Sequence, residues 1–139
     1  MVKRVLILCT SNSARSQMAE AFLSQLRPQW QVISAGTQPA ERVHPKTIQV
    51  MAEVGFDLIN AKTKNVQQFL NDSFDYVITV CDHAQETCPV FWGEVKEQVH
   101  LGFADPAATI GSEEEILAVF RRVRDDIKKE FTKFVEESH

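Results

Sequence analysis

The chain has 139 residues, and its 15 Lys and Arg against 19 Asp and Glu give a formal charge of −4. Hydrophobic residues make up 44% and charged residues 24%, values that suit one globular domain and argue against disorder. A mildly acidic chain lacks the basic face that nucleic acids require, and no apolar run approaches the ~18 residues of a membrane helix. We therefore expect a single soluble domain over residues 1–139, cytoplasmic and by default monomeric, with no nucleic-acid or membrane partner.

The three cysteines bear on the redox chemistry. Cys9, Cys81 and Cys88 cannot all pair within one chain, and three are too few for the disulfide scaffold of a small secreted protein. The apolar run at the amino terminus ends at Cys9 with no small-residue cleavage site after it, so it does not indicate a secretory signal. In a reducing compartment these residues are inert core thiols, metal ligands or reactive groups.

The first half of the chain indicates strand, helix, strand and helix in that order. Short β-rich apolar runs predict the strands, and apolar residues at helical spacing predict the helices. Proline and glycine mark where these elements begin or stop. The predicted strands are residues 3–8 and 30–35, and the predicted helices are residues 16–26 and 45–54.

The second half indicates a weak helix, two strands and a long final helix. The weak helix covers residues 65–70, and the strands cover 76–80 and 98–101, with a loop at 102–111. Ser112 and the glutamates after it form a capping box that opens the last helix. Its apolar stripe consists of Ile116, Val119, Phe120, Val123, Ile127, Phe131 and Val135.

Strands that alternate with helices predict an α/β fold, here an open four-stranded parallel sheet with helices on both faces. In such sheets ligands bind outside the carboxyl ends of the strands. Cys9 directly follows the first strand and Cys81 the third, and Asp105 lies four residues beyond the fourth. We therefore expect these three residues to meet at one edge of the sheet.

Residues 9–15, the anion loop, join the first strand to the first helix through small polar residues. Such a loop directs backbone N–H groups to one point at the positive end of a helix dipole, and Arg15 adds a planar fork for two oxygens. The same field favours a thiolate, so we expect Cys9 to have a depressed pKa. The alternative is a buried strand-end thiol at Cys9 and a surface charge at Arg15.

The loop residues have individual expected roles. Asn12 tolerates the left-handed backbone of a tight cradle, and the Ser16 hydroxyl can donate to the thiolate. The predicted oxyanion-binding residues are Thr10, Ser11, Asn12, Ser13, Ala14, Arg15 and Ser16.

Cys81 and Cys88 are seven positions apart. Seven residues span about 10.5 Å on a straight helix, whereas a disulfide needs Cα atoms about 4.4–6.8 Å apart. The segment between them must therefore bend, and its lack of apolar anchors makes local unfolding cheap. The alternatives are two unconnected thiols or a zinc site with His83, which would need Cys9 as fourth ligand and would block the anion loop. We predict no metal site.

Residues 9–20 (CTSNSARSQMAE) resemble the phosphate loop of the low-molecular-weight protein tyrosine phosphatase fold. Within that fold they resemble the thioredoxin-coupled arsenate reductases. The resemblance extends over nearly the whole chain, through residues 34–37 (SAGT), the pair Cys81 and Cys88 before Pro89, and residues 102–107 (GFADPA).

The resemblance implies a reaction and its participants. Cys9 attacks arsenate held by the loop and Arg15, and Asp105 is the general acid, although an Asp-Pro pair alone equally suits a turn. Cys81 and then Cys88 carry the oxidation as disulfides, which thioredoxin reduces. Arsenite is the product, phosphate or sulfate would mimic arsenate, and no tightly bound cofactor is implied.

The chain departs from the family pattern at several positions. Ala14 stands where some relatives have cysteine, and Ser11 where glycine is common. Some relatives bind potassium beside the loop through Asn, Glu, Ser and Asp. Asn12, Glu20 and Ser34 match that set, but Lys64 holds the aspartate position, so we expect an ammonium there and activity insensitive to potassium.

Three alternatives to a thioredoxin-coupled reductase stay open. A tyrosine phosphatase would use Cys9, Arg15 and Asp105 identically, although Ala107 and Ala108 stand where many such phosphatases carry an aromatic pair. A regulatory thiol switch would form the disulfide without turnover. A glutaredoxin-coupled reductase would differ only in its electron donor.

Overall fold

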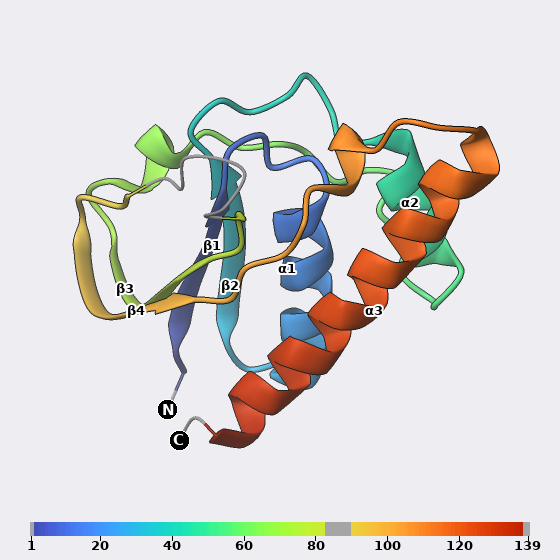
Figure 1. Cartoon of the computed structure of the whole chain (residues 1–139). Coiled ribbons are helices and arrows are strands. Elements are labelled where there is room, and N and C mark those ends of the chain that lie inside the picture. Colours follow the sequence, from blue (N-terminus) through green and yellow to red (C-terminus); the bar gives the residue numbers. More distant parts are fainter. Residues whose placement is uncertain (1, 83–89, 138–139) are drawn as a thin grey trace.

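The structure, a computed structural model, describes residues 2–82 and 90–137. Its centre is a four-stranded sheet in the order β2-β1-β3-β4, in which every neighbouring pair is parallel (Figure 1). The strands are β1 (Arg4–Cys9), β2 (Gln31–Gly36), β3 (Ser73–Thr79) and β4 (Glu94–His100). The α/β fold class and the parallel sheet predicted from the sequence are confirmed.

Three α-helices lie on the same side of this sheet and contact one another (Figure 1). They are α1 (Arg15–Leu26), α2 (Pro45–Ala52) and α3 (Glu113–Glu137). Among the residues the structure describes, the helical element on the opposite side is the 3-10 helix η1 (Val66–Phe69), where a weak helix was predicted. The two faces of the sheet are therefore covered unequally. None of the described helices is long and apolar enough to cross a membrane.

Strand β1 is buried on both faces because it lies between β2 and β3. Successive side chains of a strand point to opposite faces. Val5, Ile7 and Cys9 therefore pack with the α-helices, whereas Leu6 and Leu8 pack on the other side. This placement fixes Cys9 at the carboxyl end of the central strand, on the helix-covered face.

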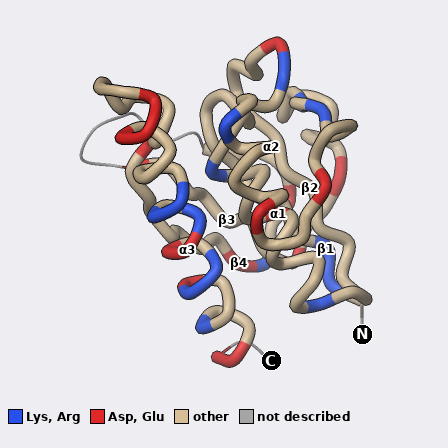
Figure 2. Tube along the Cα trace, turned by 90° about the vertical axis from the view of Figure 1, so that its right-hand side faces the viewer, with Lys and Arg blue, Asp and Glu red and all other residues tan. Residues whose placement is uncertain are grey.

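Helix α3 begins with the predicted capping box. Glu115 N donates to Ser112 Oγ and Ser112 N to Glu115 Oε1, both at 3.1 Å. Figure 2 shows both signs of charge along α3, as expected of a helix with a solvated side. Of the predicted stripe, Phe120, Val123, Ile127, Phe131 and Val135 are buried, and Ile116 and Val119 are partly buried.

The sequence patterns placed two strand boundaries too late and missed a short helix. Strand β4 starts at Glu94 because it is an edge strand whose exposed polar side chains break the apolar pattern. Strand β3 starts at Ser73, and the loop predicted at 102–111 contains the 3-10 helix η2 (Pro106–Ala108).

Candidate active site

The anion loop joins β1 to α1 at the carboxyl end of the sheet, as predicted. Each carbonyl oxygen from Cys9 to Ala14 accepts a hydrogen bond from outside the loop. The donors and distances are Thr37 N to Cys9 O (3.3 Å), Gln38 N to Thr10 O (2.9 Å), Ala40 N to Ser11 O (2.9 Å), Gln17 Nε2 to Asn12 O (3.1 Å), His44 N to Ser13 O (3.0 Å) and Met18 N to Ala14 O (3.0 Å).

This arrangement directs backbone N–H groups toward the inside of the loop. The C=O and N–H of a trans peptide point in opposite directions, and the described chain has no cis peptide. Carbonyls that point outward therefore turn the following N–H groups toward the inside of the loop. Asn12 N illustrates this, because it donates to Cys9 Sγ at 3.1 Å. The result is a cradle of backbone donors at the start of a helix.

Two residues with unusual backbone requirements shape the cradle. Asn12 has a φ of 54°, which confirms the expected left-handed conformation. Gly36 ends β2 against the loop, where a Cβ would overlap the Thr10 carbonyl oxygen and lie 3.1 Å from Asn12 N. Glycine at this position is therefore required by close approach of the two backbones.

The Cys9 thiol is 1% exposed and is a free cysteine. Its Sγ shares a 2.8 Å hydrogen bond with Ser16 Oγ, which confirms the predicted partner. Burial raises the pKa of Cys9, whereas the Ser16 hydroxyl, the Asn12 amide and the Arg15 charge lower it. The expected depressed pKa is wrong for this structure. The predicted donors are present, but the loop encloses the sulfur and excludes the water that would stabilise a thiolate.

Arg15 and Asp105 meet beside the loop. Arg15 is 3% exposed rather than a surface charge, and its Nη1 donates to Phe103 O at 3.2 Å. Its Nη2 lies 3.8 Å from Asp105 Oδ2. The other oxygen of Asp105 accepts from Ala107 N at 3.0 Å and caps η2. Asp105 therefore lies beside the loop that starts at Cys9, as the predicted meeting of Cys9, Cys81 and Asp105 at one edge of the sheet requires.

Cys81 lies at the same edge of the sheet. Val80 N donates to Leu8 O at 3.1 Å, so the chain after β3 continues beside β1 as far as Val80. Cys81 follows directly, is fully buried, and is disulfide-bonded. Cys88 and His83 lie outside the described residues, so the predicted pairing of Cys81 with Cys88 stays a prediction.

The family model described as low molecular weight phosphotyrosine protein phosphatase matches residues 4–138. The chain belongs to this family. An arsenate reductase of Halalkalibacterium halodurans is 44% identical over 135 residues, which cover 96% of each chain. A crystal structure of arsenate reductase from Archaeoglobus fulgidus is similar, with a TM-score of 0.77 and 31% identity over 96% of this chain and 99% of that chain. An arsenate reductase in the phosphate binding state gives a TM-score of 0.76 and 29% identity, over 99% of this chain and 100% of that one.

In this member of the phosphatase family, four residues gather behind the cradle. Asn12 Nδ2 donates to Ser34 Oγ at 2.9 Å, and Ser34 N donates to Glu20 Oε1 at 2.7 Å. Lys64 N donates to Asn12 Oδ1 at 2.9 Å, and Lys64 Nζ lies 3.7 Å from Glu20 Oε1. The expected ammonium beside Glu20 is therefore present. Insensitivity to potassium stays a prediction.

His44 and Thr47 also contribute to the site, although no sequence pattern indicates this role. His44 is the N-cap of α2, its Nδ1 accepts from Lys46 N at 3.1 Å, and its ring packs on Phe120. Burial and the charge of Lys46 lower the pKa of His44, which keeps Nδ1 an acceptor. Thr47 Oγ1 donates to Ser13 O at 3.0 Å. Pro45 at the start of α2 was the only local signal here.

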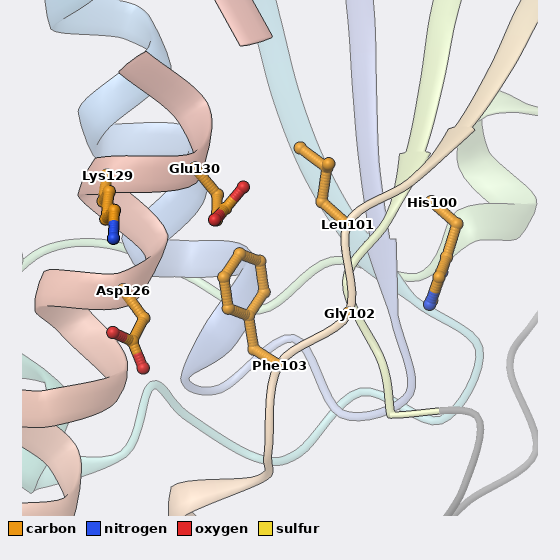
Figure 3. Close-up of a pocket in the computed structure, with 7 residues that line it drawn as sticks. All are labelled: His100, Leu101, Gly102, Phe103, Asp126, Lys129 and Glu130. Carbon is orange, nitrogen blue, oxygen red and sulfur yellow. The ribbon is translucent and has the colours of Figure 1, made fainter. Parts of the chain in front are cut away.

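A separate pocket of about 370 Å³ lies between α3 and the chain after β4 (Figure 3). Phe103 points toward α3 in this view, while its carbonyl oxygen accepts from Arg15. The lining residues are His100, Leu101, Gly102, Phe103, Asp126, Lys129 and Glu130. Cys9, Arg15 and Asp105 do not line it, so this pocket is distinct from the loop that holds Cys9.

Proposed function

We propose that this chain reduces arsenate to arsenite. The observation that carries the proposal is the enclosed cradle that holds Cys9 and Arg15, with Cys81 at the same edge of the sheet, in a chain 44% identical to an arsenate reductase. A tetrahedral oxyanion fits a loop whose N–H groups converge on one point, and the cysteines supply the electrons that a phosphatase reaction does not need.

In the first step, the Cys9 thiol gives its proton to an arsenate oxygen and Sγ attacks arsenic, while the loop amides and Arg15 hold the oxygens. An arsenic–oxygen bond breaks as the sulfur–arsenic bond forms, and Asp105 protonates the departing oxygen so that water leaves. The 3.8 Å separation of Arg15 Nη2 from Asp105 Oδ2 supports this assignment, because it puts the carboxyl group next to the guanidinium that would hold the arsenate oxygens. Arsenic remains As(V) in this thiolate adduct.

In the second step, reduced Cys81 attacks Cys9 Sγ. The sulfur–arsenic bond breaks and its electron pair goes to arsenic, which leaves as As(III) in arsenite while a Cys9–Cys81 disulfide forms. Cys88 then attacks Cys81, which releases Cys9 as a thiol and leaves a Cys81–Cys88 disulfide. The pairing of Leu8 with Thr79, extended by the Val80–Leu8 hydrogen bond, supports the approach of Cys81 to Cys9.

The proposed electron donor is reduced thioredoxin, with no tightly bound cofactor. Thioredoxin exchanges thiols with an intramolecular disulfide, and the spacing of Cys81 and Cys88 suits such a disulfide if the segment bends. A free thiol nucleophile and this donor both require a reducing compartment, so we place the reaction in the cytoplasm. Glutaredoxin with glutathione is the alternative donor.

Phosphotyrosine hydrolysis is the second candidate, because it needs the same three groups and gives the family its name. After Asp105, however, Ala107 and Ala108 are small and exposed, so they offer no platform for an aromatic ring. The proposal therefore favours arsenate over an aryl phosphate.

The test is NADPH consumption by the purified chain with thioredoxin and thioredoxin reductase, with and without arsenate. The Cys9→Ser variant serves as the blank, and hydrolysis of an aryl phosphate is measured in parallel. We expect arsenate-dependent NADPH oxidation that the variant lacks. Hydrolysis of the aryl phosphate without arsenate-dependent oxidation, with either thioredoxin or glutaredoxin as donor, would overturn the proposal in favour of a phosphatase.

A further inference from the structure

The outer side of the anion loop is braced by residues 37–44, the bracing segment, and by the first turn of α2. The Ser13 carbonyl oxygen accepts two hydrogen bonds from this region. It accepts from His44 N and from Thr47 Oγ1, each at 3.0 Å. Thr47 is thus a side chain of α2 that bonds directly to the backbone of the cradle.

We infer that Thr47 is a positioning residue for oxyanion binding and acts through the Ser13–Ala14 peptide. Holding the Ser13 carbonyl toward α2 turns the Ala14 N–H the opposite way, toward the cradle. This inference rests on the proposed function, because it assumes that the cradle binds an oxyanion. Thr47 itself does not touch the anion.

Because Thr47 is buried, its hydroxyl restricts the orientation of the Ser13–Ala14 peptide. Thr47 is fully buried and Ser13 is 7% exposed, so neither group can exchange its partner for bulk water. An unpaired buried hydroxyl or carbonyl is costly, which favours this one orientation of the peptide. Without the Thr47 hydroxyl, the Ser13 carbonyl oxygen would keep only the hydrogen bond from His44 N.

Helix α2 is a rigid support for this bond. Val50 and Met51, on its next turn, are fully buried in the core, and Glu53 after its end binds Arg121 and Arg124 of α3. The orientation of the Ser13–Ala14 peptide is therefore set by a packed helix rather than by the loop alone.

The variants that test this inference separate the hydroxyl from the volume of the side chain. Thr47→Val removes the hydroxyl at nearly constant shape, and Thr47→Ser keeps it. Thr132→Val is the matched control, because Thr132 Oγ1 bonds to Lys128 O within α3. The readouts are the affinity for inorganic phosphate by calorimetry and the KM and kcat for arsenate.

We expect Thr47→Val to weaken phosphate binding by about five- to tenfold, the effect of one net hydrogen bond. The KM for arsenate should rise by a similar factor, while Thr47→Ser and Thr132→Val stay near the wild-type values. If the valine variant does not fold, Thr47→Ala removes the same hydroxyl without adding a methyl group against the loop. Its phosphate affinity is then compared with that of Thr47→Ser.

Wild-type phosphate affinity in the variant without the hydroxyl would overturn the inference, as would failure of Thr47→Ser to restore it. A wild-type chain that does not bind phosphate would overturn it as well, since there would be no cradle to position. Phosphate binding is independent of arsenate reduction. A chain that reduces no arsenate but loses phosphate affinity in Thr47→Val would therefore contradict the proposed function and support this inference.

Discussion

Arg15 Nη2 lies 3.8 Å from Asp105 Oδ2, although Arg15 begins the helix after the central strand and Asp105 follows the edge strand β4. The two residues meet because parallel strands end at the same edge of the sheet. Ala107 N, by donating to Asp105 Oδ1, fixes the carboxyl group in this position. The Asp105 carboxyl group is therefore held beside the Arg15 guanidinium.

Replacing the Asp105 carboxyl group should lower the rate of the chemical step and change the affinity for the anion little. We expect Asp105→Asn to lower the single-turnover rate of arsenate reduction by about a hundredfold or more, because general acids contribute roughly 10²–10⁴. Phosphate affinity, measured by calorimetry, should change little, since Asn keeps the cap of η2. Asp125→Asn, on the outer part of α3, is the control. An equal loss of affinity and rate would instead mean that Asp105 holds the loop.

The Cys9 thiol should react with alkylating agents only at high pH. Burial raises the pKa of Cys9 above its ordinary value of 9.0, so the reactive thiolate becomes populated only as the pH rises beyond that value. The alkylation rate of the ligand-free, reduced chain should therefore increase steadily through pH 9, as measured by mass spectrometry of the Cys9 peptide. Ser16→Ala should shift the increase to still higher pH because the thiolate loses a donor. An alkylation rate that no longer changes with pH above pH 7 would contradict the raised pKa of Cys9.

The activity of the chain should be insensitive to potassium. Lys64 Nζ, 3.7 Å from Glu20 Oε1, supplies the positive charge at this position. Replacing sodium by potassium at constant ionic strength should leave the rate of arsenate reduction unchanged. Lys64→Gln should weaken phosphate binding, whereas Lys62→Gln, on an exposed neighbour, should not. A large rise in wild-type activity with potassium would contradict this role for Lys64.

The link between α2 and α3 should weaken in acid. Hydrogen bonds from Arg121 and the adjacent charge of Arg124 lower the pKa of Glu53 to about 2. A carboxyl whose folded pKa is depressed stabilises the fold above its unfolded pKa, and this stability is lost as the pH falls from the ordinary value of 4.5 toward 2. Glu53→Gln should cost about 1 kcal/mol at pH 7, since the pair is partly exposed. Its difference from wild type in urea unfolding should shrink below pH 4.5 and vanish once the pH is below about 2, and a difference that persists undiminished as the pH falls would contradict the ion-pair origin.

The features that could be predicted from the sequence are those with local signals. The apolar run of β1, the small polar loop up to Arg15 and the capping box at Ser112 each occupy a few consecutive residues, and the structure confirms them. The position of Asp105 beside the loop that starts at Cys9 could also be predicted, because a parallel sheet brings the ends of its strands to one edge.

The bracing of the loop could not be predicted in this way. Its donors in residues 37–44 are backbone N–H groups, which every residue except proline carries. Only the fold shows which of them face a loop carbonyl. The direction of the Cys9 pKa shift could not be predicted either, because burial raises the pKa while three neighbouring groups lower it. The extent of burial is a property of the packed structure.

The most direct test of arsenate reduction at Cys9 is the amount of arsenite that a reduced Cys88→Ser variant forms after all external reductant has been removed. The account predicts about one arsenite for each chain, a Cys9–Cys81 disulfide in the peptide map, and no arsenite from Cys9→Ser. Repeated turnover by Cys88→Ser with thioredoxin would contradict the relay. The absence of arsenite, together with hydrolysis of an aryl phosphate by the wild-type chain, would contradict the reductase itself.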